Sequence, residues 1–565
     1  MDESQRIRLC LLDDLQKVKM QEDLTAKPRR SRKFRALQGQ RLNFQVALFT
    51  PVHTFLSCQV DSLFRECVTL RRAGMVFCDL PADPQDPLAA TAEPGYFPDP
   101  LLPLGKGGLL STPARKWISL WVSVDIPREC PSGRHFLRLS FSTPSREQLH
   151  LAWDPEPFPP QVVEVELEII PGELPRQTLW SCSWFHVDCL QRWHNMGFQD
   201  DCFWEILRLY VTDMVAHGVN VLFTPLWTPP LDTAIGHERP TCQLLQITEE
   251  GGRYHFDFSL LEKWIRLARE CGMERFEFAH AFTQWGARAT PKILVNGERR
   301  FGWDVAATSP EYREFLDQFL PQLADFLRGH GLAGKCIFHN SDEPWPDSLE
   351  RYRESLALMT RHLPDGEFPV MDAMSDVDFV KQGVCHRPIP VTTYLENFQG
   401  LPLKSRWCYY CGGTWQHGSS NRLMGLPSWR NRALGVLLYA LGQEGFLHWG
   451  HNFWFSQYSL DWDLNPWQDT SAGYGFLGGD SFLVYPGRQG EGQGPVDSLR
   501  YEVFAEAMQD YRACQLLESL AGREKVLEIL QEGVERPLKM TDYPHSEEWV
   551  LDVNERVLQA IDRLL

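Results

Sequence analysis

The chain has 565 residues and a formal net charge of −18, and 43% of its residues are hydrophobic. This length exceeds what one ordinary hydrophobic core organises, so we expect a folded protein of two or more domains. The acidic surplus argues against nucleic acid as a partner, because binding to phosphates depends on basic residues that release counterions.

The N-terminal segment lacks the features of an export signal. Residues 1–16 carry acidic residues where a signal peptide has a basic region. The most apolar segment, Ala433–Leu441, is too short to cross a membrane and predicts a buried helix. The 15 cysteines are odd in number and show no disulfide spacing. We therefore expect a cytoplasmic protein with reduced thiols and no membrane partner.

Residues 1–176 have the pattern of an N-terminal β-sandwich. Apolar runs such as Leu42–Phe49 and Trp117–Val124 are separated by turns and proline-rich pieces. In Val162–Ile170 apolar and polar residues alternate, which is the period of a strand buried on one face.

Residues 177–487 alternate apolar strands with amphipathic helices, and residues 488–565 predict helices packed on the outside. No glycine-rich phosphate turn follows the first strand, so a (β/α)8 TIM-like barrel fits better than a doubly wound sheet. The predicted fold class is thus multidomain β + α/β. The expected strands are Ser181–Asp188, Val219–Thr224, Arg275–His280, Lys335–His339, Pro369–Ala373, Pro390–Tyr394, Trp407–Cys411 and Gly445–His451. The expected helices between them are Phe203–His217, Leu260–Cys271, Pro310–Arg328, Leu349–His362 and Trp429–Gly442.

The fourth predicted strand is followed by two adjacent carboxylates. Asp342 and Glu343 come after an apolar run that ends in His339, and Pro344 follows them. In a barrel, catalytic groups lie at the carboxyl ends of the strands, so this pair is the candidate acid/base pair. The alternative is a strand-to-helix turn, in which Asp342 caps a helix and Pro344 occupies its first position.

Polar and aromatic residues also follow the other predicted strands. Taken one at a time, such residues are more often packing residues. Together, at one mouth of a barrel, they predict a pocket that hydrogen-bonds hydroxyl groups and stacks on sugar rings. The candidate substrate-binding residues are His280, Trp285, His339, Asp372, Tyr394, Trp407, Tyr409, Trp449, His451 and Trp454.

The adjacency of Asp342 and Glu343 bears on the mechanism. The two carboxyls of a retaining glycosidase with a protein nucleophile lie about 5 Å apart, and those of an inverting enzyme roughly 6.5–9.5 Å apart. Neighbours on a regular strand point to opposite faces, so both reach one ligand only where the strand has ended. An adjacent pair suits substrate-assisted catalysis, in which one carboxylate orients an acetamido group and the other protonates the leaving oxygen. The anionic neighbour would raise the pKa of that acid.

A metal-dependent hydrolase is a competing interpretation. The first strand carries His-x-Asp where His-x-His would be expected, and the single C-x-x-C motif has no second pair to complete a zinc site. We therefore expect no metal and no other cofactor. The residues that could form a ligand set are His186, Asp188, His280, His339 and Asp342.

Six motifs occur in order along the chain: Gln38–Val46, Tyr96–Leu101, Ser341–Pro344, Gly445–Trp454, Leu483–Gly487 and Arg500–Tyr511. In this order they resemble glycoside hydrolase family 123, the β-N-acetylgalactosaminidases, within the broader domain of unknown function 4091 family. The resemblance implies that Asp342 orients the acetamido group and that Glu343 is the acid/base. The chain departs from the family pattern at His448, where a tyrosine is usual, and at Ala507, where a glycine is common.

Two classes of function follow. The leading hypothesis is an exo-glycosidase with a small carbohydrate substrate, which hydrolyses a terminal β-linked 2-acetamido-2-deoxy sugar, expected to be β-N-acetylgalactosamine, with retention. The alternatives are a non-hydrolytic carbohydrate-binding barrel protein and the metal-dependent hydrolase. A binding protein has no need for an adjacent Asp-Glu pair, which favours the enzyme.

Overall fold

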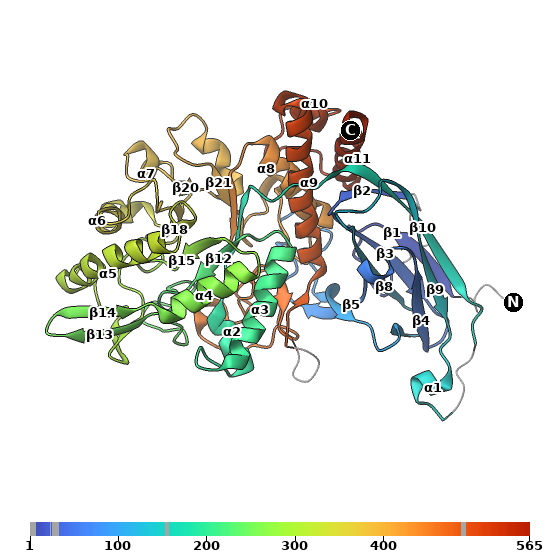
Figure 1. Ribbon diagram of the computed structural model, residues 1–565, viewed down its shortest axis with the longest axis horizontal. Helices are drawn as coiled ribbons and strands as arrows, with labels where there is room; N and C mark the ends of the chain where they lie inside the picture. Colours follow the sequence, from blue (N-terminus) through green and yellow to red (C-terminus); the bar gives the residue numbers. More distant parts are fainter. Residues whose placement is uncertain (1–6, 23, 25–32, 153–156, 488–492) are drawn as a thin grey trace. The chain divides into compact units, whose positions relative to one another are not determined.

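The structure, a computed structural model, describes residues 7–22, 24, 33–152, 157–487 and 493–565. The chain divides into two compact units, which are described separately (Figure 1). The first comprises Met1–Arg176, Met424–Ala440 and Val496–Leu565, and the second comprises Gln177–Leu423 and Leu441–Pro495. Among the described residues, none of the helices combines the length and apolar character needed to cross a bilayer.

Two five-stranded sheets form the β-rich part of the first unit, with strand orders β1-β3-β8-β5-β6 and β2-β10-β9-β4-β7. Neighbouring strands run antiparallel except β2 and β10, which run parallel. The strands are β1 Arg8–Leu12, β2 Lys33–Gln38, β3 Arg41–Phe49, β4 Thr54–Asp61, β5 Val68–Cys78, β6 Gly95–Pro103, β7 Leu109–Thr112, β8 Trp117–Asp125, β9 Gly133–Ser142 and β10 Gln161–Glu173.

The two sheets share one hydrophobic core. In β10 the alternation ends at Ile170, which is buried next to Ile169. Before it, Val163, Val165, Leu167 and Ile169 are buried and the residues between them are less buried, as the alternating pattern predicts. They belong to the same cluster as Phe44 of β3, in the other sheet. The prediction of a β-rich N-terminal unit is confirmed.

Helices complete the first unit: α1 Arg146–Leu149, α8 Ser428–Ala440, α9 Leu499–Ala521, α10 Arg523–Gln531 and α11 Glu547–Leu564, with the short strand β24 Val496–Asp497. A Cβ atom on Gly435 of α8 would lie 1.8 Å from the carbonyl oxygen of Ala507 in α9, so this close approach needs glycine. The grouping differs from the expected one, in which residues 488–565 formed a separate segment on the barrel. The reason is that α9 packs along α8 and also contacts α11 and β6.

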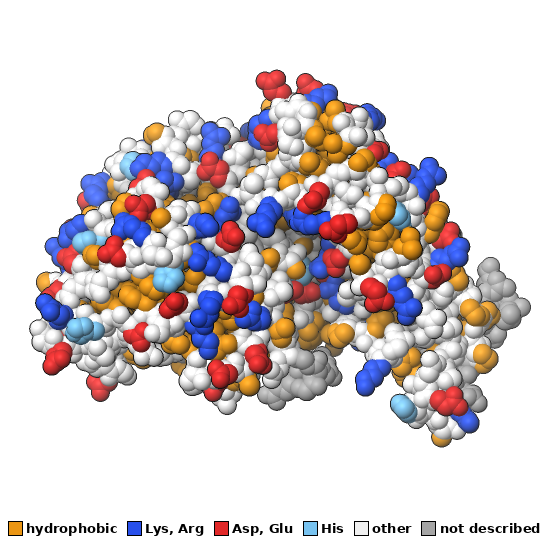
Figure 2. Space-filling model, viewed as in Figure 1, with side chains coloured by type: hydrophobic (Ala, Val, Ile, Leu, Met, Phe, Trp, Pro, Cys, Tyr) orange, Lys and Arg blue, Asp and Glu red, His pale blue; other side chains and the backbone are white. Residues whose placement is uncertain are grey.

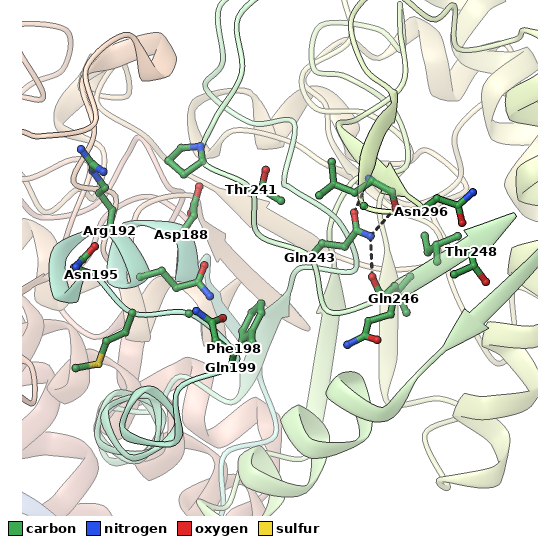
Figure 3. A pocket seen from close by; sticks show the side chains of 18 residues that line it. Asp188, Arg192, Asn195, Phe198, Gln199, Thr241, Gln243, Gln246, Thr248 and Asn296 are labelled. Carbon is green, nitrogen blue, oxygen red and sulfur yellow. Dashed lines mark hydrogen bonds between the residues drawn. The ribbon is translucent and has the colours of Figure 1, made fainter.

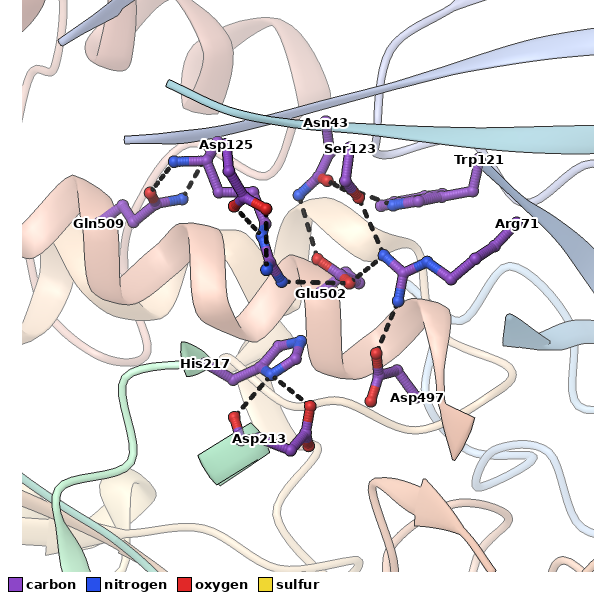
Figure 4. Close-up of polar contacts among 11 residues, drawn as sticks. Asn43, Arg71, Trp121, Ser123, Asp125, Asp213, His217, Asp497, Glu502 and Gln509 are labelled. Atoms are coloured by element: carbon purple, nitrogen blue, oxygen red, sulfur yellow. Dashed lines mark hydrogen bonds and ion pairs between the residues drawn. The ribbon is translucent and has the colours of Figure 1, made fainter. Parts of the chain in front are cut away.

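A buried polar network links the first sheet to α9 (Figure 4). Arg71 of β5 donates hydrogen bonds to Asp497 at 2.6 Å and to the Ser123 hydroxyl at 2.9 Å, and it also contacts Glu502. Asn43 donates to Glu502 at 3.3 Å. Glu502 is fully buried, so these donors compensate for its loss of hydration.

Arg432 of α8 is the cation of a second buried cluster, and its removal is a test of stability. It donates to Asp14 at 2.9 Å and to Asp510 at 2.9 Å, and it contacts Glu506. Breaking a buried ion pair costs about 3–5 kcal/mol, because a buried charge is left without its partner. We expect Arg432→Met to lower the free energy of unfolding by about this amount, measured by urea denaturation. The control Arg138→Met removes an exposed ion pair and should leave the free energy of unfolding nearly unchanged; equal losses would contradict the prediction.

A six-stranded parallel sheet lies at the centre of the second unit, with strand order β18-β15-β12-β11-β22-β21. Two further strands, β19 and β20, form a separate parallel pair. The structure thus shows a parallel half-barrel sheet in place of eight continuous strands. Prolines lie within and beside β20, and proline lacks the N–H that a sheet ladder needs. The strands are β11 Trp180–Ser183, β12 Val221–Thr224, β15 Arg275–Phe278, β18 Cys336–Phe338, β19 Asp372–Ala373, β20 Pro388–Ile389, β21 Trp407–Tyr409 and β22 Gly445–His448.

The remaining elements of the second unit follow these strands. Ser309 caps the helix Pro310–Gly329 by accepting a hydrogen bond from the Tyr312 N–H, and Pro310 is its first residue. The helices are α2 Val187–His194, α3 Asp201–Ala216, α4 Ser259–Glu270, α5 Pro310–Gly329, α6 Leu349–Thr360 and α7 Asp378–Lys381. The other strands are β13 Gln246–Glu250, β14 Arg253–Asp257, β16 Ile293–Val295, β17 Glu298–Phe301 and β23 Val484–Tyr485. In the face shown in Figure 2, acidic and basic side chains are intermixed.

Candidate active site

The Asp-Glu pair lies in a turn beyond β18. The Asp342 carbonyl accepts a hydrogen bond from the Trp285 N–H at 2.7 Å, and the Glu343 N–H donates to the Ala373 carbonyl at 3.1 Å. Glu343 has φ 40°, a left-handed conformation that is uncommon for a residue with a Cβ atom. The neighbours α6 and the short helix Pro346–Ser348 begin later, so the alternative in which Asp342 caps a helix is wrong.

The two carboxylates have different surroundings. The Glu343 side chain is exposed, and its Oε1 accepts a hydrogen bond from the Tyr409 hydroxyl at 2.5 Å. Burial and the Glu343 charge raise the pKa of Tyr409 well above its usual value, so the phenol stays protonated and donates. Burial, followed by the Glu343 charge, also raises the pKa of the half-buried Asp342 well above its usual range, and the charge of His339 opposes this.

His339, which follows β18 and precedes the pair, lies between the buried carboxylates of Glu277 and Asp372. Its Nε2 is 2.5 Å from Oε1 of Glu277, and its Nδ1 is 3.4 Å from Oδ1 of Asp372. Burial lowers the pKa of His339, but the hydrogen bonds and charges of Asp372 and Glu277 outweigh it and raise the pKa to about 10. Trp184 donates to the same Glu277 oxygen at 2.6 Å. His339 is therefore an imidazolium that hydrogen-bonds to Glu277 through Nε2 and forms an ion pair with Asp372 through Nδ1.

His280 stacks on this imidazolium, with ring centroids 4.4 Å apart and planes 17° from parallel. Burial and the His339 charge lower the pKa of His280 well below its usual value, so its ring is neutral. One ligand atom each from His280, His339 and Asp372 could meet around a metal ion, since these atoms lie within 4.8 Å of one another. However, Asp372 already accepts from the Asn340 N–H at 2.9 Å and the Tyr352 hydroxyl at 2.5 Å. These contacts favour a hydrogen-bonded network.

The charge on His339 makes the stability of the protein depend on pH. Its pKa rises from about 6.5 in an unfolded chain to about 10 in the fold. The stabilisation is fully present below pH 6.5 and is lost as the pH rises toward 10. We expect the free energy of unfolding to fall across this window, with a slope of up to about 1.4 kcal/mol per pH unit from this group. Urea denaturation at several pH values should show that His339→Gln loses this part of the slope and that exposed His386→Gln keeps it. An unchanged slope in His339→Gln would remove His339 from this role.

Of three other predicted residues, Trp285 contacts the pair directly, and Trp449 and His451 have other partners. Trp285, whose N–H fixes the turn, stacks on Trp345 with centroids 6.1 Å apart. Trp449 donates from Nε1 to Oδ2 of Asp480 at 3.1 Å. His451 is fully buried and packs on Phe185. Burial lowers the pKa of His451 to about 3, so its ring is neutral.

The remaining three predicted residues contact residues other than the pair, and their surroundings differ from one another. Trp407 is the first residue of β21 and packs against Gly445 and Trp180, so it lies at the amino end of the strands, whereas Asp342 follows the carboxyl end of β18. Trp454 is buried and donates to the Val484 carbonyl at 3.2 Å. Tyr394 is 52% exposed and lies on the 3-10 helix Thr392–Phe398, because β20 ends before it.

The first-strand residues of the competing metal interpretation also have other partners. β11 ends before His186, which precedes α2, and Asp188 lies in α2. Arg239 donates to both oxygens of Asp188 at 2.8 Å, and its Nη2 is 3.1 Å from Nδ1 of His186. His186 Nε2 lies 2.8 Å from the Trp449 carbonyl oxygen. Asp188 therefore serves as the counter-ion of a buried arginine.

Sequence reasoning missed several polar residues of the site. Asp232 has φ 40° and accepts a hydrogen bond from the Tyr458 N–H at 2.9 Å. Burial, with a contribution from the Asp480 charge, raises the pKa of Asp232 to about 7. Asp232 and Asp480 lie in loops whose sequence has no helix or strand periodicity, so no pattern in the sequence marked them as site residues. Glu277 did leave one, because it is an acidic residue inside the apolar strand Arg275–Phe278.

Comparisons with known proteins bear on this arrangement. A family model for the catalytic domain of glycoside hydrolase 123 matches residues 184–517. The structure of a family 123 glycoside hydrolase from Clostridium perfringens, described for glycolipid glycan hydrolysis, matches with a TM-score of 0.73 and 16% identity over 99% of this chain and 98% of that chain. A PapD-like domain of a human protein matches with a TM-score of 0.15 and 10% identity over 31% of this chain and 91% of that one, too weakly to carry weight. No curated protein matches the chain.

Proposed function

Because the chain belongs to the glycoside hydrolase 123 family and is a glycoside hydrolase, we propose that it removes a terminal β-linked 2-acetamido-2-deoxy sugar, N-acetylgalactosamine above its epimers, by a retaining, substrate-assisted mechanism. The observation that carries the proposal is the adjacent Asp342 and Glu343 in a left-handed turn beyond β18. The C. perfringens relative is described for glycolipid glycan hydrolysis, and a glycolipid glycan is the source of terminal sugar that we propose here.

The two carboxylates have separate roles in this mechanism. The acetamido oxygen attacks the anomeric carbon as the bond between that carbon and the leaving oxygen breaks. Glu343 gives the leaving oxygen a proton. Asp342 accepts the acetamido N–H and faces the positive charge that develops on the resulting ring. Glu343 then takes a proton from the water that opens this ring. The exposure of Glu343 supports its role, because the leaving group and water must reach it.

A positive charge beside Asp342 lowers the pKa that burial and Glu343 have raised. Asp342 therefore interacts more strongly with the transition state than with the neutral substrate, which is the condition for catalysis. The Tyr409 hydroxyl holds Glu343 in place until a leaving oxygen arrives.

We also propose that the eight parallel strands act as one (β/α)8 barrel. Single parallel bridges join Phe338 to Val370 and Val391 to Tyr409, next to the pair β19 and β20. These bridges support closure of the half-barrel into a ring, which would bring all strand ends to one mouth.

Around that mouth we assign Trp285 and the exposed Trp345 to stacking on the sugar ring, and Asp232 to its hydroxyl groups. We assign His280, His339 and Asp372 the role of holding the Asp342–Glu343 pair in position. The 15 cysteines are free thiols, which supports a reducing, cytoplasmic setting.

Chromogenic substrates test the proposal directly. Nitrophenyl N-acetyl-β-galactosaminide should be hydrolysed, and the matching β-galactoside should not be hydrolysed at a useful rate, because it lacks the internal nucleophile. The N-acetyl-β-glucosaminide tests selectivity at C4. Efficient hydrolysis of the galactoside, or a sugar ester trapped on a carboxylate, would overturn the mechanism.

A further inference from the structure

A crevice of about 720 Å³ lies in the second unit (Figure 3). It lies between α2 with the segment that follows it, the segment that leads into β13, and the turn between β16 and β17. Neither Asp342 nor Glu343 lines it, and nor do Asp232, Tyr409 or Asp480. Its volume is in the range of sites that bind small molecules.

Amide side chains dominate the polar lining of the crevice. Two of them stabilise the crevice itself. Gln243 donates to the carbonyls of Leu245 at 2.7 Å and Leu294 at 3.0 Å, and Asn296 exchanges two hydrogen bonds of 3.1 Å with the Glu249 backbone. Four others have side chains that hydrogen-bond to no described residue, namely Gln191, Asn195, Gln199 and Gln246. Each free amide offers two donors and an acceptor oxygen to a ligand.

The charged residues of the lining are already paired. Arg239 binds both oxygens of Asp188 at 2.8 Å. Arg192 donates to both oxygens of Asp463, at 2.8 and 2.9 Å. The crevice therefore offers amides without an uncompensated charge, which suits a neutral ligand rich in hydroxyl groups better than a phosphate or a carboxylate.

An aromatic ring lies among the free amides. Phe198 is half-buried, and its ring packs on Phe203 and Trp204 with centroids 5.6 and 5.7 Å away. In Figure 3 it lies next to Gln199. A ring fixed in this way is a platform for the C–H face of a sugar, while amides bind the hydroxyl groups at its rim.

We propose that this crevice is a second saccharide-binding site, which holds a neutral glycan away from the catalytic carboxylates. Such a site would keep the enzyme on a glycan-rich surface between successive cleavages. Asp188 borders the crevice, and through Arg239 it is joined to His186 and the Trp449 carbonyl. The crevice is thus joined through hydrogen bonds to Trp449, which follows β22.

Binding of lactose and cellobiose tests this proposal by saturation-transfer NMR. Neither disaccharide carries an acetamido group, so binding is independent of the catalytic mechanism proposed above. The wild-type protein should bind at least one of them with a millimolar Kd. The double variant Gln199→Ala/Gln246→Ala should weaken that binding at least about fivefold, because two hydrogen-bonding groups are lost. Gln382→Ala, an exposed glutamine outside the crevice, should leave it unchanged.

The outcomes separate the two proposals. Turnover of the nitrophenyl N-acetyl-β-galactosaminide should be the same in the double variant and the wild type, because this small substrate does not reach the crevice. Circular dichroism confirms that the variant is folded. The proposal is overturned if neither disaccharide binds, if the double variant binds as tightly as the wild type, or if the anionic sialyllactose binds more tightly than lactose.

Discussion

Replacing Glu343 by glutamine lowers kcat on a substrate with a poor leaving group, such as a methyl glycoside, by about 10²–10⁴-fold, the usual contribution of general acid catalysis. A nitrophenyl leaving group departs without a proton, so the first step with that substrate is largely spared. The two substrates should therefore differ in how much activity they lose. Initial rates with both glycosides, measured on the same enzyme preparation, give this ratio.

Glu350→Gln is the matched control for this experiment. Glu350 is an exposed acid on α6, a few residues along the chain from Glu343, and it pairs with the exposed Arg353. Its replacement should change neither rate. Small and equal losses on both substrates in Glu343→Gln would remove Glu343 from the acid role.

Asp342→Asn should lose both turnover and affinity for a thiazoline analogue of the cyclic intermediate. The analogue resembles the charge and shape near the transition state, so the wild-type enzyme should bind it far more tightly than free N-acetylgalactosamine. Removing the negative charge should cost about 10²–10³-fold in kcat, the size of effect seen when one electrostatic contact to a transition state is lost. Inhibition constants and rates of the two proteins provide the measurement.

The pattern of losses identifies what Asp342 does. If it faces the developing charge, thiazoline binding and kcat fall together while binding of the free sugar changes little. An Asp342→Asn protein that keeps its thiazoline affinity would assign the acetamido group to another residue. Asp232 would then be the next candidate, because the charge of this half-buried carboxylate contributes to the raised pKa of Asp342 and Asp232 thus lies in its electrostatic surroundings.

The position of the Asp-Glu pair could be predicted from sequence because an apolar run that ends in polar residues marks the carboxyl end of a parallel strand. The same signal failed for Trp407, since an apolar run does not show which of its residues begins the strand. Tyr394 was expected on a strand that ends early at prolines. Asp232 and Asp480 depend on loop paths fixed by distant contacts, such as the hydrogen bond between Asp232 and the Tyr458 N–H.

The β-rich N-terminal unit was predictable for a different reason. Strict alternation in β10 is a local property, and burial on one face follows from it directly. The inclusion of α8 and α9 in this unit was not predictable, because it rests on the close approach at Gly435 and on ion pairs between segments far apart in the chain.

The order in which the ribosome delivers these segments has a consequence for biogenesis. Asp14, Asp86 and Asp99 are buried with Arg432, Arg430 and Arg500, so each acid is synthesised hundreds of residues before its arginine. The first sheets are therefore synthesised long before the arginines with which these three acids are buried. Contacts of such sequence separation form slowly and leave intermediates exposed to aggregation. A nonsense mutation upstream of Arg430 would thus remove the cationic partners of all three acids.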